Sequence, residues 1–362
     1  MRILTLSALL VGCQPDYQLQ SKDDNLGGLA DTGTSDPDGD DPGAVSDPSK
    51  LASVKGRVCN PAGDGYVVGA TAYVTYDSDG DGSSDARVQD LTDGDGYFLL
   101  EGVPLGQHTI HIEKGSFTAD ITVLLDTEGE LVELAEEECL DATDVNIAVV
   151  TGQYDHIGEI LDGLGLEYTT YVGTSNQYVS LLRDPAAMAE YDIIFFNCGM
   201  SDGWQSHFTE VSGNLATYVR EGGSIYTSDW AFGIFEAAFP DAVDFYGNDS
   251  FEDVIVGVAG NIRADVIDPN FRTILGSNVA DLRYDLDSWA VAVSAGSNAD
   301  ILIQGDAQTF DWWTFSYDTV RSAPLALRIS RGEGRAIYTS FHNENQITVD
   351  MQKLLEEIIL SL

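Results

Sequence analysis

Short apolar runs alternate with helix-forming stretches from residue 144 to the C-terminus, and this alternation restricts the fold more than any other feature. Residues 145–150, 191–196 and 224–227 are predicted to be buried strands, because each is a short apolar or β-branched run that ends in a turn. Strands that are joined through helices pair in parallel, and the helices cover both faces of the sheet. The sequence therefore predicts an α/β domain at residues 144–362, built on a flavodoxin-like, doubly wound parallel sheet.

The remaining elements of this region follow from the same patterns. A further strand is expected at 168–172, and helices are expected at 156–163, 178–182, 208–219 and 348–360. Beyond Pro240 the pattern loosens into shorter strands, among them 301–303 and 326–329. We expect this later part to form an insertion and the far edge of the sheet.

Polar side chains follow two of the predicted strands. Ser228 and Asp229 come directly after one strand. His342 and Glu344 come directly after another, the apolar run 336–341. Open α/β sheets bind their ligands at the carboxyl ends of the strands. The sequence therefore predicts that these strand ends form one site.

A family resemblance is carried by the order of the elements, by GGSIYTSDW and by GEGRAIYTSFHNE. This part of the chain resembles the class I glutamine amidotransferase-like superfamily, in its trehalose-utilisation-type (ThuA-like) branch. In catalytic members, a Cys on a sharp turn is activated by a His-x-Glu pair, which His342 and Glu344 match. The position of that Cys falls at Ser228 or Asp229, and the surrounding Gly-x-Cys-x-Gly is absent. This departure argues against amidotransferase chemistry.

Two nucleophiles remain as alternatives. Ser228 with His342 as base and Glu344 as the orienting group would form a triad by role. Against it, Asp229 and Trp230 stand where small residues normally leave room for oxyanion donors. Cys198, which ends the neighbouring strand in FNCGMSDGW, is the other candidate; the alternative is a structural thiol.

A metal site is a further alternative at the same strand ends. His342 and Asp229 supply ligand types that suit zinc, and His207 or Asp202 would complete the set. His156, after the first strand, is interpreted as a polar helix-start residue with Asp155 as a cap. The simplest interpretation is that these groups bond one another and line a shallow crevice, since a fold does not establish an activity. We expect this non-catalytic arrangement.

Residues 53–141 have an all-β pattern, with strands expected at 54–58, 70–76, 97–100, 109–112 and 121–125. Gly, Pro and Asp between the runs are typical of a small β-sandwich. The Gly-Ala before the second strand, the Asp-Gly-Tyr-Phe turn and Val-Pro-x-Gly resemble the carboxypeptidase regulatory-like, transthyretin-like module. The resemblance implies a non-catalytic spacer or adhesion unit.

An acidic loop, DSDGDGSSD, lies between strands of this module. Asp77, Asp79, Asp81 and Asp85 are candidate calcium ligands, because hard cations bind several carboxylate oxygens and Gly82 allows a sharp turn. Val88 stands where a bidentate Glu is expected, so the loop departs from a full EF-hand. A solvated acidic hairpin is the alternative.

The first 13 residues are typical of a secretory signal, with Arg2 followed by an apolar run too short to span a membrane. Leu-Val-Gly-Cys resembles the bacterial lipobox, which implies acylation of Cys13, palmitate among the chains, and a membrane anchor. The alternative is an ordinary signal with a chance Cys. Gln14 resembles the residue of outer-membrane lipoproteins in a Gram-negative cell. Residues 14–52, rich in Asp, Gly, Ser and Pro, are predicted to be a disordered acidic tether.

Charge and cysteine content narrow the function. The net charge of −43 argues against nucleic-acid binding, because the chain would repel phosphate groups. In an exported protein Cys59 and Cys139 are the preferred disulfide pair, which leaves Cys198 free. The sequence thus predicts a lipoprotein of the bacterial envelope with a non-catalytic binding or surface-assembly role, toward a carbohydrate or another envelope protein. The alternative is a hydrolase of ester, amide or carbohydrate-related substrates.

Overall fold

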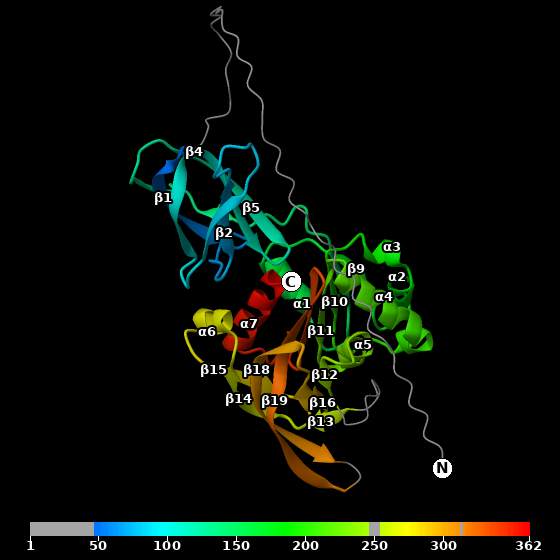
Figure 1. Ribbon diagram of the computed structural model, residues 1–362. Coiled ribbons are helices and arrows are strands. Elements are labelled where there is room, and N and C mark those ends of the chain that lie inside the picture. Colours follow the sequence, from blue (N-terminus) through cyan, green and yellow to red (C-terminus); the bar gives the residue numbers. More distant parts are fainter. Residues whose placement is uncertain (1–46, 246–253, 312–313) are drawn as a thin grey trace, which may run out of the picture. The chain divides into compact units, whose positions relative to one another are not determined.

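The computed structural model describes residues 47–245, 254–311 and 314–362 (Figure 1). The predicted signal segment, its Cys13 and nearly all of the predicted tether lie outside the described residues. None of the helices in the described part has the length and apolar character that a membrane crossing needs. The described chain is rich in sheet and begins with an all-β part that is followed by a mixed part of strands and helices.

The N-terminal part is a sheet with the strand order β3-β2-β4-β1-β6, in which β5 also pairs with β4 and β7 with β1. Alternate side chains of its strands point into the core, among them Val54, Phe98 and Ile110. Cys59 and Cys139 are Cα partners on β1 and β7 and form the predicted disulfide. The strands are β1 (Asp47–Cys59), β2 (Thr71–Tyr76), β3 (Ala86–Leu91), β4 (Tyr97–Lys114), β5 (Phe117–Leu125), β6 (Leu131–Glu133) and β7 (Glu138–Cys139).

Strand β4 corrects one prediction. The sequence predicted separate strands at 97–100 and 109–112, but one strand runs through both. Its first half pairs with β1 up to Leu105 and its second half with β5 from Gly106, so the exchange of partner falls between these two residues. Gly102 and Gly106 both have positive φ, so the strand bends there without ending. The turn residues that suggested a break therefore mark a bend. Strand β3, whose side chains are alternately half-buried and exposed, was not predicted.

Five strands of the second part pair in parallel, as predicted, in the order β9-β8-β10-β11-β20. The three strands that the sequence predicted as buried runs, β8, β10 and β11, have no exposed side chain. The strands are β8 (Ile147–Val150), β9 (Thr169–Tyr171), β10 (Ile193–Phe196), β11 (Ser224–Ser228) and β20 (Gly334–Thr339). The helices are α1 (Ile157–Gly163), α2 (Tyr178–Leu182), α3 (Pro185–Met188), α4 (Phe208–Arg220), α5 (Phe232–Ala238) and α7 (Val349–Leu360).

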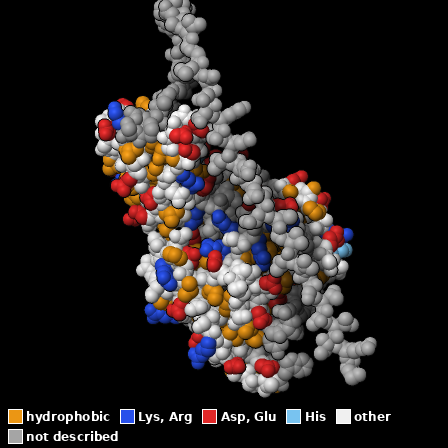
Figure 2. All heavy atoms as spheres, in the orientation of Figure 1, with side chains coloured by type: hydrophobic (Ala, Val, Ile, Leu, Met, Phe, Trp, Pro, Cys, Tyr) orange, Lys and Arg blue, Asp and Glu red, His pale blue; other side chains and the backbone are white. Residues whose placement is uncertain are grey.

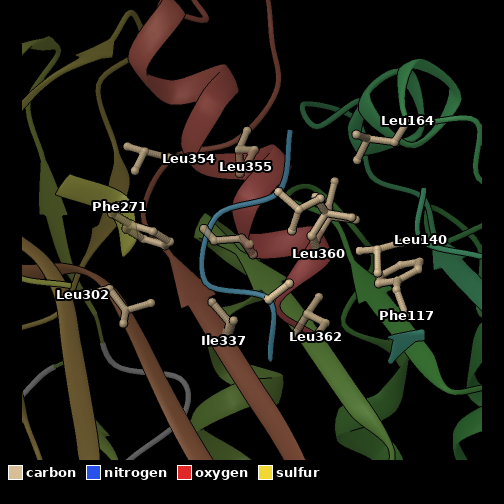
Figure 3. Close-up of a cluster of buried hydrophobic side chains, with 14 of the residues drawn as sticks. Phe117, Leu140, Leu164, Phe271, Leu302, Ile337, Leu354, Leu355, Leu360 and Leu362 are labelled. Atoms are coloured by element: carbon tan, nitrogen blue, oxygen red, sulfur yellow. The ribbon is translucent and has the colours of Figure 1, made fainter. Parts of the chain in front are cut away.

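Helices pack on both faces of these parallel strands. Because side chains alternate along a strand, Ile337 of β20 faces α1 and α7, whereas Tyr338 faces the helices from α2 to α5. Figure 3 shows Leu354, Leu355 and Leu360 of α7 among the buried residues around Ile337. Burial on both faces explains why the strands read as continuous apolar runs.

An antiparallel extension continues the same sheet beyond β20, in the order β15-β14-β18-β19-β20. The short strands predicted at 301–303 and 326–329 belong to two long strands, the first near the start of β18 and the second near the end of β19. Polar residues alternate with apolar ones in the rest of β18 and predominate at the start of β19, so the apolar runs marked only part of each strand. The elements are β12 (Val243–Asp244), β13 (Ile255–Gly257), β14 (Gly260–Val266), α6 (Pro269–Leu275), β15 (Val279–Tyr284), β16 (Trp289–Val291), β17 (Ser294–Ala295), β18 (Ala299–Asp311) and β19 (Ser316–Arg331).

The end of α7 packs against the turn between β4 and β5. Lys114 forms a buried ion pair with Glu357 and also donates to the carbonyl of Val68. Ser116 Oγ donates to the Leu362 carbonyl at 3.0 Å. The N-terminal sheet and the C-terminal helix are therefore joined by a buried charge pair as well as by apolar contacts.

Charge on the surface is mixed. Acidic side chains are scattered over the face drawn in Figure 2, with basic side chains between them. The net charge of −43 belongs to the whole chain. On the visible face it does not gather into a single negative patch.

Candidate functional site

Three side chains that differ in chemistry meet at the carboxyl ends of three adjacent strands. Cys198 follows β10, Asp229 follows β11 and His342 follows β20. The Cys198 thiol donates to Asp229 Oδ2 at 3.3 Å, and His342 Nε2 lies 3.6 Å from the same oxygen. All three side chains are buried. Thus the predicted strand ends do meet, with Cys198 among them.

The backbone holds Asp229 in a fixed orientation. Asp229 begins a short 3₁₀ helix (Asp229–Ala231) and has φ of 43°, in the left-handed region that side chains other than glycine rarely adopt. Its Oδ1 accepts a hydrogen bond from the backbone N–H of Ala290 at 2.7 Å. That bond leaves Oδ2 facing the thiol and the imidazole. Strained positions of this kind cluster at functional sites.

A second polar pair lies behind this cluster. Ser228 Oγ donates to Asp155 Oδ2 at 2.5 Å and accepts from the Cys198 backbone N–H at 2.9 Å. Burial raises the pKa of Asp155, although the nearby His342 and the Ser228 hydroxyl act in the opposite direction. Asp155 Oδ1 has no hydrogen-bond partner among the described residues.

Sequence reasoning missed the role of Asp155. Asp155 was interpreted as a helix cap. The N-cap of α1 is instead His156, whose side chain makes no capping hydrogen bond. The backbone of His156 pairs instead with Asn343, through hydrogen bonds of 2.8 Å. A signal did exist, because Asp155 follows a buried strand closely, as Asp229 does.

Burial and charge set the protonation of the cluster. Burial disfavours the charged imidazole of His342, but Asp229 and Asp155 together outweigh it and raise its pKa. Burial, reinforced by the Asp229 carboxylate, raises the pKa of the Cys198 thiol far above its ordinary value. Cys198 is therefore a neutral thiol that donates a hydrogen bond, and the thiolate needed for nucleophilic attack is disfavoured.

The cluster forms the floor of a pocket of about 230 Å³. One wall is the segment 283–289, which joins β15 to β16. In this wall Trp289 stacks on Tyr284, with ring centroids 4.1 Å apart. Exposed Tyr154 and Trp230 also line the pocket. The remaining polar lining residues are Arg283, Asp285, Asp287, Ser288, Ser340, Glu344 and Gln346.

The triads predicted from the sequence are not assembled in this structure. Ser228 is fully buried and bonds with Asp155 and Cys198, and no hydrogen bond joins it to His342 among the described residues. Glu344 lines the pocket, but His342 Nδ1 has no hydrogen-bond partner in the described part of the chain. The imidazole therefore faces Asp229.

Two residues proposed as further zinc ligands lie elsewhere. His207 Nδ1 is 3.8 Å from Glu210 Oε2, at the start of α4. Asp202 lines a different pocket, together with Trp204 and Phe232. Neither residue lines the pocket above the Cys198 cluster. Of the predicted zinc set, only His342 and Asp229 are brought together.

The acidic loop of the N-terminal part is held by its own hydrogen bonds. Carboxylate oxygens of Asp77, Asp79 and Asp81 lie within 4.8 Å of one another. Asp77 accepts from the N–H of Gly82, and this bond is the main reason why its pKa is lowered. Asp85 instead accepts from the N–H and hydroxyl of Ser78. Calcium binding by this loop stays a prediction.

Comparison with known proteins finds only distant structural similarity. No protein-family model matches the chain, and no curated protein matches it. The chain is similar to cytoplasmic protein STM3548 from Salmonella typhimurium, at 13% identity and a TM-score of 0.35, over 60% of this chain and 97% of that one. It is also similar to cytoplasmic protein STM1381 from Salmonella typhimurium LT2, at 12% identity and a TM-score of 0.38, over 58% of this chain and 93% of that one. A β-galactosidase from Rahnella sp. R3 is similar at 13% identity and a TM-score of 0.32, over 60% of this chain and 31% of that one. These TM-scores are too low to assign a family.

Proposed function

We propose that this protein is a lipid-anchored lipoprotein of the bacterial envelope, whose pocket binds a small carbohydrate without covalent catalysis. The observation that carries the proposal is the composition of the pocket, in which exposed aromatic rings lie beside carboxylates above a floor with no free nucleophile. Pockets of this kind bind small ligands through apolar faces and a few placed polar groups.

The fold assignment belongs to the same proposal. The parallel order β9-β8-β10-β11-β20 is the order 2-1-3-4-5 of flavodoxin-like sheets, which supports a flavodoxin-like, amidotransferase-like domain. In that order the strands are added first to one side of β8 and then, from β10 on, to the other side, and such switch points are where open α/β sheets bind ligands. Asp155 and Cys198 follow these two strands. The N-terminal part is proposed to be a carboxypeptidase regulatory-like module.

The state of the two candidate nucleophiles favours binding over covalent catalysis. The Ser228 hydroxyl already donates to Asp155, and its side chain is fully buried. The Cys198 thiol donates to Asp229 and resists ionisation. An attacking group needs a base within hydrogen-bond reach and an exposed path to the substrate. Neither residue meets both conditions.

A carbohydrate suits the walls of the pocket. Trp230 is 42% exposed and Tyr154 is 44% exposed, so both offer an apolar ring face to a ligand. The Trp230 ring is fixed by a hydrogen bond of 2.5 Å from Nε1 to the Ser288 carbonyl. Asp287 and Glu344 provide acceptors for hydroxyl groups. A volume of about 230 Å³ fits one sugar unit better than a protein segment.

Binding is tested by titrating the purified protein with a panel of mono- and disaccharides while tryptophan fluorescence and heat are recorded. Replacement Trp230→Ala is expected to weaken binding at least about tenfold, equivalent to about 1.4 kcal/mol. Tyr317→Ala removes an exposed aromatic ring that does not line the pocket, and it should leave binding unchanged. Absence of binding by every sugar, or equal affinity of the Trp230 variant, would contradict the proposal.

The alternative function, hydrolysis, is tested by a separate assay. A hydrolase would release product from ester or amide substrates and would lose that turnover in His342→Ala or Cys198→Ser. The assay is needed because Cys198 and His342 both lie at the pocket floor. It is made on the same protein preparations as the sugar titrations. Turnover that depends on either residue would replace the non-catalytic assignment.

The anchor rests on the sequence alone, in which Cys13 follows Leu-Val-Gly. Bacteria that express the full chain and are fed labelled palmitate are expected to label the protein and to retain it in the membrane fraction. Cys13→Ser should abolish both. Release of the unsubstituted protein into the soluble fraction would contradict the anchor.

A further inference from the structure

We infer that Cys198, Asp229 and His342 bind one divalent transition-metal ion at the floor of the pocket, with zinc as the best fit. A thiolate, a carboxylate and an imidazole are the three side-chain types that zinc binds in proteins. One of each is present, and their nearest ligand atoms all lie within 4.8 Å of one another. This inference goes beyond the proposed function, because it requires no carbohydrate.

The two distances to Asp229 lie in the range of a coordination shell. Zinc bonds of about 2.0 Å to nitrogen or oxygen and 2.3 Å to sulfur place tetrahedral ligand atoms ~3.3–3.6 Å apart. Cys198 Sγ and Asp229 Oδ2 are 3.3 Å apart, and His342 Nε2 and the same oxygen are 3.6 Å apart. The third distance, between Cys198 Sγ and the His342 ring nitrogen, is within 4.8 Å, so these two side chains would have to approach each other for one ion to bind all three atoms.

The surroundings orient the ligands in the way that metal sites require. Asp229 Oδ1 is held by the Ala290 N–H, which turns Oδ2 toward the other two ligands. The backbone of Cys198 is held by Ser228, which in turn is held by Asp155. Such outer partners fix first ligands in place and strengthen metal binding.

The fourth position faces the pocket. All three ligand residues line it, so an ion held by them would be open to water or to a bound molecule on that side. Gln346 lines the same pocket, and its side chain is more than nine-tenths buried. Its Oε1 has no hydrogen-bond partner among the described residues. An unpartnered buried oxygen at the pocket indicates that a polar species belongs there.

Binding would exchange protons for the ion. The Cys198 thiol loses its proton to solvent as the sulfur–metal bond forms, and a proton on His342 Nε2 leaves to solvent in the same way, so that the thiolate, the imidazole and the carboxylate each donate a lone pair. No oxidant or reductant is involved. Imidazole and thiolate favour zinc over calcium or magnesium, which prefer oxygen ligands.

Cobalt is the probe of choice, because a cobalt–thiolate bond gives an absorption band that carboxylates and imidazoles do not. The purified protein, freed of metal by chelation, is titrated with Co²⁺ and then with Zn²⁺, and bound zinc is measured after dialysis. We expect one equivalent of Co²⁺ to produce the thiolate band and one equivalent of Zn²⁺ to remove it.

Variants test the assignment of each ligand. Cys198→Ser should abolish the band, and His342→Ala should raise the dissociation constant for zinc by more than about 100-fold, the upper range for loss of an outer-shell partner. Glu210→Gln changes a half-exposed carboxylate that does not line the pocket and should leave zinc binding unchanged. Asp79→Asn controls for the acidic loop.

Failure of this inference is distinct from failure of sugar binding. No thiolate band in the folded, unsubstituted protein overturns it, as does a zinc equivalent that survives both Cys198→Ser and His342→Ala. Because the first of these results needs no variant, a misfolded variant does not leave the inference untested. Circular dichroism of each variant establishes that it is folded.

Discussion

Ser228 and Asp155, 73 positions apart in the sequence, share a hydrogen bond of 2.5 Å beneath the pocket. Both side chains are buried, and the Ser228 oxygen also accepts from the N–H of Cys198. Replacement Ser228→Ala leaves a buried carboxylate oxygen and a buried N–H without this partner. We expect the free energy of unfolding to fall by about 1–3 kcal/mol. Denaturant unfolding measures it, and Ser212→Ala on the exposed side of α4 should change it little.

The ion pair between Lys114 and Glu357 yields a second prediction. Both side chains are buried, so removal of one charge leaves the other without its partner. Glu357→Leu alone should cost about 3–5 kcal/mol of stability. The double replacement Lys114→Met with Glu357→Leu should cost much less, because no charge stays buried. A double variant as unstable as the single one would contradict this account.

Gly152 allows two chain segments to approach closely. A Cβ at this position would lie 1.8 Å from the Cys198 carbonyl oxygen, so Gly152→Ala must push the turn after β8 away from Cys198. We expect a loss of about 1–3 kcal/mol and weaker ligand binding in the pocket.

Gly213 provides the matched control for Gly152. It lies inside α4, and a Cβ there meets nothing within 4 Å. Gly213→Ala should stabilise the protein by up to about 1 kcal/mol. Thermal unfolding of the two variants separates the steric effect from the helix propensity. Equal effects of the two substitutions would show that the close approach at Gly152 is unimportant.

His108 predicts part of the pH dependence. Burial lowers the pKa of His108, and its hydrogen bond of 2.8 Å to the Pro104 carbonyl opposes the shift only in part. Below pH of about 6.5 the unfolded chain therefore takes up a proton that the folded chain resists. The contribution of neutral His108 to the free energy of unfolding is therefore present above pH of about 6.5, and it is lost as the pH falls through the lowered pKa of the folded protein.

The measurement is the stability of the protein and of His108→Gln between neutral and mildly acidic pH. The free energy of unfolding of the unsubstituted protein should exceed that of His108→Gln most at neutral pH, and this difference should shrink on acidification. A difference that is constant over this range would contradict a lowered pKa. Comparison with the variant is necessary because many carboxylates also titrate as the pH falls.

The central part of the fold could be predicted because burial on two faces leaves a strong signal. β8 and β10 read as continuous apolar runs, and β11 and β20 as buried runs rich in apolar and β-branched residues; the ends of β10, β11 and β20 carry the residues that form the pocket floor. The disulfide could be predicted because Cys59 and Cys139 lie near the two ends of the all-β region. These features depend on local composition.

The rest depends on pairing, which local composition does not encode. β4 continues through Gly102 because it stays paired with β1 there and passes to β5 only at Gly106, and these partners are distant in the sequence. The pocket wall at 283–289 exists because β15 and β16 join the antiparallel extension, and no motif marks it. Likewise, the spacing of Asp155 and Ser228 gives no indication that the two side chains meet.

The floor and the wall of the pocket come from two halves of one sheet. β20 pairs in parallel with β11 and antiparallel with β19, so the parallel half supplies Cys198, Asp229 and His342, while the other half supplies segment 283–289. Hydrogen bonds tie this wall to the parallel half: Trp230 Nε1 donates to the Ser288 carbonyl, and the hydroxyls of Tyr284 and Ser340 bond to each other. Of loop 285–288, only the Ser288 carbonyl takes part in these two bonds. Loop 285–288 can therefore serve as a graft site, where sequences exchanged among relatives or selected from a library would alter ligand preference while the floor is inherited unchanged.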